Sequence, residues 1–201
     1  MPNAASFQTE LHKALDLRGN GQLSKETDKV LDVEAVKKII EGADKAFLDK
    51  QNSVGQTALH MMAKFNEKKI DEILAKKEIA RLLLAAGAST EVVDNHGCTP
   101  MHIACMTAEP MGGITDQLCA AGAKIMDPEK MFGYTPLHWA AASGLPDVIR
   151  PLLTHPDIKA ALQIPATDGK TPLEIAQAKA DAKPYPWKSS LDIVKLIKAL
   201  K

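Results

Sequence analysis

Three histidines occupy the same position of a recurring phrase, and histidine is a residue type that binds metal ions and transfers protons near neutral pH. They are His60, His102 and His138. If the segments that carry them stack side by side, successive histidines lie about 10 Å apart, the usual packing distance between helices. Side chains held in register at that distance cannot converge on one ion. The spacing therefore favours a structural role, in which each buried histidine finds hydrogen-bond partners.

The cysteines give no sign of a disulfide framework or a zinc site. Cys98, Cys105 and Cys119 are odd in number and form no CxxC pair, so reduced thiols in an intracellular protein are the simplest interpretation. Cys105 aligns with Ala63 and Ala141 of the other copies of the phrase. Because free cysteine packs like a small hydrophobic residue, we expect Cys105 in the core and not as a reactive thiol.

Residues 16–27, DLRGNGQLSKET, imitate a calcium-binding loop in part. Plausible ligand positions are held by Asp16, Asn20, Gly21 and Ser24. Arg18, however, stands where an oxygen ligand is needed, and Thr27 replaces the bidentate glutamate that the geometry requires. A polar connector between two helices is therefore favoured over an ion site.

Other motifs of catalysis are absent from the sequence. It contains no glycine-rich phosphate loop, nucleophile elbow or paired-carboxylate motif. We therefore expect no catalytic residue, no cofactor and no metal, and a protein that is not an enzyme.

Composition indicates an ordinary globular protein. Lys plus Arg and Asp plus Glu number 25 each, so net charge gives no reason to expect nucleic acid or an anionic membrane as partner. Aromatic residues make up only 4%, which favours a core of Leu, Ile, Ala and Met in tightly packed helices. No stretch resembles a signal peptide or approaches the roughly 20 apolar residues of a membrane span. A cytoplasmic or nuclear protein is expected.

The elements that position these residues follow from one phrase that occurs four times. It reads GQTALH, GCTPMH, GYTPLH and GKTPLE, and its threonines are Thr57, Thr99, Thr135 and Thr171, at intervals of 42, 36 and 36. Threonine is a good N-cap and proline after it is preset for the first helical turn, so each phrase predicts the start of a helix. A second apolar helix follows each phrase, and two of these end at Gly87 and Gly122, where glycine can close a helix.

These phrases resemble the ankyrin repeat, whose period is about 33 residues and whose signature is this Thr-Pro-Leu-His phrase followed by a Leu-rich helix and Gly-Ala. The resemblance covers roughly residues 32–201. It implies an all-α solenoid of stacked helix-turn-helix units with projecting hairpin loops, in a single domain of residues 1–201. We expect five units, of which the first and last are caps. Their ranges are approximately 6–54, 55–96, 97–132, 133–168 and 169–201.

Two units depart from the repeat length. Thr57 and Gly87 are 30 residues apart, whereas about 21 separate the equivalent residues in the family. The inserted part, residues 65–77, keeps apolar residues at helical spacing, which predicts lengthened helices and not a loose loop. The last unit carries a similar excess over residues 183–190, which Pro184 and Pro186 should keep from being helical.

The resemblance implies a partner-binding surface, because hairpin tips and first helices form the groove that usually receives a protein in this family. The expected binding residues are Val54, Lys64, Asn95, His96, Met106, Lys130, Met131, Phe132 and Tyr134. Gln56 and Cys98 occupy further groove positions. Met131 and Phe132 could instead fold back onto the stack. Trp139 is interpreted as packing.

The expected function is therefore that of an adaptor, scaffold or regulatory and inhibitory binding protein. The alternative is a small enzyme or a calcium-binding protein built on an ankyrin scaffold. The acidic residues Asp94, Asp127, Glu129 and Asp168 flank the aromatic positions and favour a protein partner with a basic and apolar surface. Tyr185 and Trp187 form a second candidate surface. The protein is expected to be a monomer.

Overall fold

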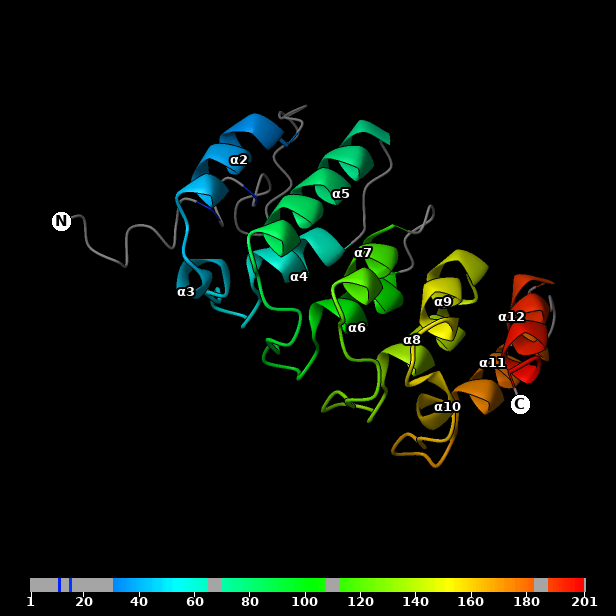
Figure 1. Ribbon diagram of the computed structural model, residues 1–201. Coiled ribbons are helices and arrows are strands. Elements are labelled where there is room, and N and C mark those ends of the chain that lie inside the picture. The colour runs from blue at the N-terminus through cyan, green and yellow to red at the C-terminus, as the bar shows by residue number, and fades with distance from the viewer. Residues whose placement is uncertain are drawn as a thin grey trace, which may run out of the picture.

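A computed structural model describes residues 11, 15, 31–64, 70–107, 113–182 and 188–200. Within these ranges the chain forms helices joined by turns and contains no β-strand. Figure 1 shows helix pairs set side by side in an arc, with α2 (Val33–Glu41) and α12 (Lys188–Lys198) at opposite ends of the row. The loops between successive pairs project together from one end of the helices (Figure 1). This is the stack of helical hairpins that the repeated phrase predicts.

The helices form two layers, in which each helix contacts the next one of its layer. The first helices of the pairs are α4 (Ala58–Ala63), α6 (Pro100–Thr107), α8 (Pro136–Ser143) and α11 (Pro172–Ala180). The other layer consists of α2 (Val33–Glu41), α5 (Ile70–Ala85), α7 (Ile114–Ala120), α9 (Pro146–Leu153) and α12 (Lys188–Lys198). Two short helices, α3 (Lys45–Leu48) and α10 (Ile158–Ala161), lie in the connections between pairs. The unit boundaries given above stay predictions.

Each copy of the phrase begins a helix, which confirms the prediction from its threonine. The hydroxyl of Thr57 accepts a hydrogen bond from the backbone N–H of His60, and Thr171 caps α11 in the same way through Glu174. Such a cap satisfies an N–H that has no partner inside the helix. Helices α6, α8 and α11 start at a proline, whose missing N–H costs nothing in the first turn.

One continuous core runs through the stack and is made of aliphatic side chains. Its fully buried members include Leu59, Met62, Ile79, Leu83, Met101, Ile114, Leu118, Leu137 and Ile149. Burial of each such side chain contributes about 1.5–3 kcal/mol to folding. Where the first helices pack closely, Ala63, Cys105 and Ala141 are all 0% exposed. This confirms Cys105 as a small core residue.

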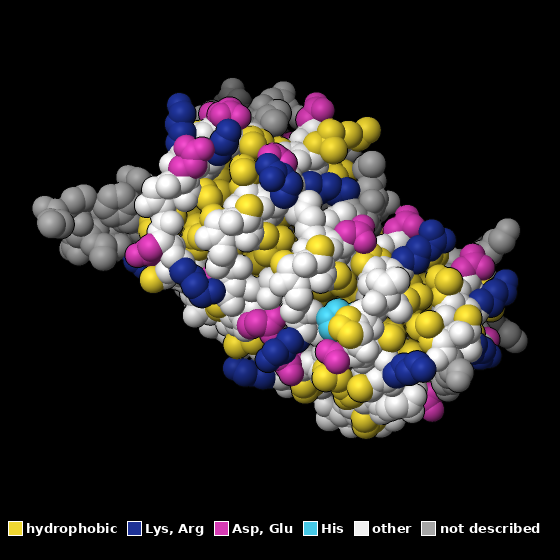
Figure 2. Space-filling model, viewed as in Figure 1, with side chains coloured by type: hydrophobic (Ala, Val, Ile, Leu, Met, Phe, Trp, Pro, Cys, Tyr) yellow, Lys and Arg dark blue, Asp and Glu magenta, His cyan; other side chains and the backbone are white. Residues whose placement is uncertain are grey.

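The insertion in the first complete pair lengthens only one of its helices. Helix α5 has 16 residues, but α4 has 6, so the expectation of lengthened helices holds for α5 and is wrong for α4. Helix α4 ends early because Lys64 leaves the helical conformation at its C-cap. Ile73 is buried, whereas Ile70 and Leu74 are 62% and 53% exposed. Figure 2 shows apolar side chains gathered over the start of α5.

Several expected features lie outside the described residues. These are the candidate calcium loop at 16–27, the start of the insertion at 65–69, and the segment 183–187 with Tyr185 and Trp187. The expectation that residues 183–190 are not helical is wrong for 188–190, because α12 begins at Lys188, after the two prolines. Of the expected first helix, Leu11 and Leu15 are described, and both are buried in the core cluster. No helix in the described part of the chain is both long and apolar enough to cross a membrane.

Candidate binding groove

The hairpins that project from the stack are joined to one another by backbone hydrogen bonds. Asn95 N–H donates to the carbonyl of Val54 at 3.2 Å, Lys130 N–H to His96 at 3.0 Å, and Thr167 N–H to Phe132 at 3.0 Å. Glycine is required where the hairpins approach, because a Cβ on Gly55 or Gly133 would lie 2.6 Å from a side chain of the next hairpin. The hairpins therefore form one continuous surface across the repeats.

A carboxylate at the base holds each of the two central hairpins. Asp94 Oδ1 accepts hydrogen bonds from the backbone N–H groups of His96 and Cys98, both at 2.9 Å. Glu129 accepts three, from Met131 at 2.5 Å, Phe132 at 2.8 Å and Tyr134 at 3.1 Å. Such charge-assisted hydrogen bonds are among the stronger ones in proteins. Asn52 performs the same role in the preceding hairpin, where its Oδ1 accepts from Val54 and Gln56.

The three recurring histidines connect each first helix to the following hairpin. In each, Nδ1 lies 2.8 Å from the hydroxyl of the capping threonine. Nε2 lies 2.9 Å from the Cys98 carbonyl in His60, 2.9 Å from the Asp127 carbonyl in His102, and 3.1 Å from the Lys170 carbonyl in His138. Burial lowers the pKa of all three side chains, and the bonds to backbone carbonyls oppose part of that shift. The structural interpretation is confirmed.

Between the central hairpins and the first helices lies an open groove with a volume of about 290 Å³. Of the predicted binding residues, Lys64, His96, Met106, Met131 and Phe132 line it. Val54, Asn95 and Lys130 are exposed on the hairpins but do not line the groove. Tyr134 lies beside it. Cys98 lines the groove floor but is only 5% exposed, so its expected exposure is wrong, because its hairpin folds tightly around Asp94.

An aromatic cluster forms one wall of the groove. The ring of Phe132 lies 5.7 Å from that of Tyr134 and 6.1 Å, edge to face, from that of Trp139. Tyr134 also stacks on His138 at 5.3 Å. Although Phe132 leans on this cluster it stays 47% exposed, and Met131 is 61% exposed. The two side chains thus fold back only partly and leave an apolar surface open to water.

Sequence reasoning missed several residues of the groove. Trp139 packs as expected but also lines the groove, together with Ile103 and Thr107. Trp139 and Ile103 occupy the same position of the repeat. This alignment was the sequence signal that could have placed both side chains in the groove. Asp94 and Glu129 were expected as flanking charges, yet both are 4% exposed and hold the hairpins from within. Asp127 and Asp168 are exposed, and Asp168 pairs with Lys170 at 2.7 Å.

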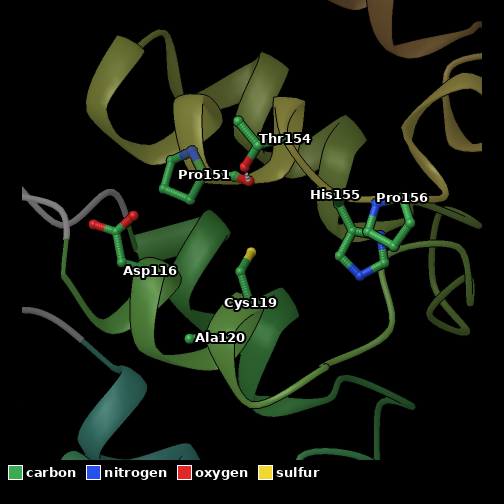
Figure 3. A pocket seen from close by; sticks show the side chains of 7 residues that line it. All are labelled: Asp116, Cys119, Ala120, Pro151, Thr154, His155 and Pro156. Atoms are coloured by element: carbon green, nitrogen blue, oxygen red, sulfur yellow. Dashed lines mark hydrogen bonds between the residues drawn. The ribbon is translucent and has the colours of Figure 1, made fainter.

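A second hollow, of about 310 Å³, lies between helices α7 and α9. Figure 3 shows the sulfur of Cys119 directed from α7 toward Pro151 of α9 and Thr154, the residue that follows α9. Burial, and secondarily the charge of Asp116, raise the pKa of the Cys119 thiol to about 11. The thiol is therefore protonated at neutral pH and is a poor nucleophile. In the ranges that the structure covers, no group of three or more His, Cys, Asp or Glu side chains is arranged to hold a metal ion.

All three thiols should react slowly with a thiol reagent in the folded protein. Burial raises the pKa of Cys98 to about 12 and that of Cys105 well above its usual value, and Cys119 is half-buried. We expect native labelling by dithionitrobenzoate to be slower than labelling in guanidinium by a factor of about 100 or more, with Cys119 first. Peptide mass spectrometry of partly labelled protein measures the order. Fast labelling of Cys98 or Cys105 would contradict the packing described here.

A row of helix pairs with joined hairpins and an open groove is typical of solenoid repeat proteins, which use such surfaces for binding. Residues 29–126 match the family model described as ankyrin repeats (3 copies), and residues 132–161 match the model of a single ankyrin repeat. Together these matches cover more than half of the 201 residues. The chain belongs to the ankyrin-repeat family.

Several proteins are similar in sequence to parts of this chain. The chain is 31% identical over 130 residues to NF-kappa-B inhibitor alpha of Homo sapiens, which covers 63% of this chain and 38% of that protein. It is 30% identical over 129 residues to the B-cell lymphoma 3 protein homolog of Mus musculus, covering 63% and 26%. It is 32% identical over 139 residues to neurogenic locus notch homolog protein 1 of Xenopus tropicalis, covering 68% and 5%. The matched region is thus well under two thirds of each relative, and these similarities support a role in protein binding.

Proposed function

We propose that this chain is a non-catalytic binding module that recruits, masks or inhibits another protein through the groove and hairpins of its central repeats. The observation that carries the proposal is the groove itself, where Phe132 and Met131 stay exposed beside Trp139. Aromatic and methionine side chains are enriched at protein interfaces. Rigid hairpins position them, because Asp94 and Glu129 fix the loops from within.

The relatives support this class of function and supply a first partner to test. One of them is named as an inhibitor of NF-kappa-B, whereas the others carry different names, so the partner itself does not transfer with the family. We propose the cytoplasm or nucleus as its location, since three free cysteines suit a reducing compartment. We further propose that the chain binds as a monomer.

Replacement of Phe132 by alanine should weaken partner binding by about 1.5–2 kcal/mol, or roughly 10- to 30-fold in Kd, because it removes a half-exposed aromatic anchor. The partner is NF-kappa-B if it binds; otherwise it is a protein that the wild-type chain captures from cell extract, identified before any variant is tested. Isothermal titration calorimetry with the purified partner measures the change in Kd.

The matched control is Leu74→Ala, which removes an apolar side chain of similar exposure, 53% against 47%, on helix α5. It should leave Kd unchanged. If Phe132→Ala and Tyr134→Ala both bind as tightly as the wild type, the groove is not the binding site. A loss with Leu74→Ala alone would move the site to the outer layer of helices.

A further inference from the structure

The end of the groove nearest the hairpins holds two buried carboxylates without a cation. Asp94 and Glu129 both line the groove and are each 4% exposed. Their hydrogen bonds come from neutral backbone N–H groups, and neither forms an ion pair within the part of the chain that the structure describes. An ionised carboxylate removed from water is costly unless it is paired, and amide dipoles offset only part of that cost.

The negative field of these carboxylates reaches the groove floor. The pKa of the Cys98 thiol rises to about 12, first because of burial and then because Asp94 and Glu129 oppose a negative charge there. The opposite effect acts on the neighbouring histidines. Asp94 favours the charged form of His60 and Glu129 that of His102, although burial dominates both pKa values. A cation at this end of the groove would therefore be stabilised.

The walls beside the carboxylates suit a long, partly apolar side chain. Met131 and Phe132 stand open to water, and Trp139 meets Phe132 edge to face at 6.1 Å. Aromatic rings attract cations, and a planar guanidinium stacks on them better than an ammonium group does. Lys64, the lysine among the described residues that line the groove, follows the last turn of α4, whereas the hairpins join the helix starts. The positive charge that would balance Asp94 and Glu129 is therefore lacking among the residues that the structure places at the hairpin end of the groove.

Resting on the proposed function, we propose that the hairpin end of this groove is a seat for one arginine side chain of the partner protein. The aliphatic stem lies along Met131 and Phe132, and the guanidinium pairs with Asp94 and Glu129. The partner therefore presents an arginine within an otherwise apolar contact segment. A buried charge pair of this kind gives specificity as well as affinity, because a neutral or acidic side chain in its place leaves the carboxylates unpaired.

A natural residue of this chain indicates which substitution removes the charge of Asp94 without disturbing the fold. Asp94→Asn removes the negative charge, but the Asn side chain keeps an oxygen that can accept from His96 and Cys98. Asn52 already does this in the preceding hairpin, where it accepts from Val54 and Gln56. The variant should fold normally, which thermal unfolding followed by circular dichroism verifies. The matched control is Asp147→Asn, which neutralises an exposed carboxylate on helix α9.

The probes are N-acetyl-arginine amide and N-acetyl-citrulline amide, which share one shape and differ in charge. Binding to the full chain is followed by the methyl resonances of Met106 and Met131 in methionine-labelled protein, both of which line the groove. We expect the arginine probe to shift these resonances with a Kd about tenfold lower than that of the citrulline probe. Asp94→Asn should reduce this difference, because only Glu129 then opposes the guanidinium, and Asp147→Asn should preserve it.

Three results would overturn the arginine seat: equal binding of the two probes, no shift of Met106 and Met131 with either probe, or an unchanged difference in Asp94→Asn. Equal binding of both probes in the groove, with loss of partner affinity in Phe132→Ala, removes the arginine seat and keeps the proposed function. Preferential binding of the arginine probe, with unchanged partner affinity in Phe132→Ala, keeps the arginine seat and removes the proposed function. The two proposals therefore fail separately.

Discussion

Replacement of His102 by alanine should lower the free energy of unfolding by about 3 kcal/mol. The imidazole is 1% exposed and satisfies groups of two structural elements at once. Its Nδ1 lies 3.1 Å from the Thr99 backbone nitrogen and 2.8 Å from the Thr99 hydroxyl, and its Nε2 lies 2.9 Å from the Asp127 carbonyl. Alanine leaves the Thr99 N–H and the Asp127 carbonyl without partners, and each buried unsatisfied group costs about 1–3 kcal/mol.

The last repeat supplies a control of the same local geometry. Glu174 occupies the histidine position and accepts hydrogen bonds from the backbone N–H and the hydroxyl of Thr171, both at 2.8 Å, but its side chain is exposed. Glu174→Ala should therefore cost about 1 kcal/mol or less, as expected for an exposed cap. Urea unfolding of both variants measures the difference. Equal losses would show that the bond from His102 to Asp127 contributes nothing.

Acidification from pH 7.5 to 5.5 should destabilise the folded chain steeply. Burial lowers the pKa of His60, His102 and His138 in the folded state, whereas the unfolded chain has the ordinary value of 6.5. Below pH 6.5 the unfolded chain therefore binds protons that the folded chain does not. The stabilisation is complete above pH 6.5 and is lost as the pH falls toward the folded-state pKa values. Each histidine contributes at most about 1.4 kcal/mol of unfolding free energy per pH unit.

Urea unfolding at several pH values between 5.5 and 7.5 tests this dependence. The His102→Gln side chain cannot titrate in this range, so the variant should be less stable at pH 7.5, and its unfolding free energy should depend less steeply on pH than that of the wild type. Carboxyl groups contribute little in this window because their ordinary pKa values lie near 4. A free energy of unfolding that is flat between pH 7.5 and 5.5 would mean that these imidazoles accept protons without unfolding of the chain.

Sequence reasoning was most successful where the cause of a feature is local or periodic. Thr57 caps a helix because its hydroxyl reaches an N–H three residues along the chain. Cys105 is buried because its register position is occupied by small residues in every complete repeat but the last. The histidines connect repeats because each buried Nε2 atom lies within hydrogen-bond distance of a backbone carbonyl of the following repeat. None of these inferences needs the distance between two remote segments.

The lining of the groove depends on distances between segments that are remote in the sequence, and only some of the predicted binding residues line it. The repeat phrase by itself determined the stack, its helix starts and its histidine links, since these arise from contacts within one repeat or between repeats of equal geometry. Only the tertiary structure decided that Asp94 and Glu129 are buried, that Trp139 faces the groove and that Phe132 stays half exposed. Those residues belong to different hairpins and helices, more than 30 residues apart for Asp94 and Glu129. Their environment is set by how closely neighbouring hairpins join, which depends on loop lengths and on backbone bonds between repeats.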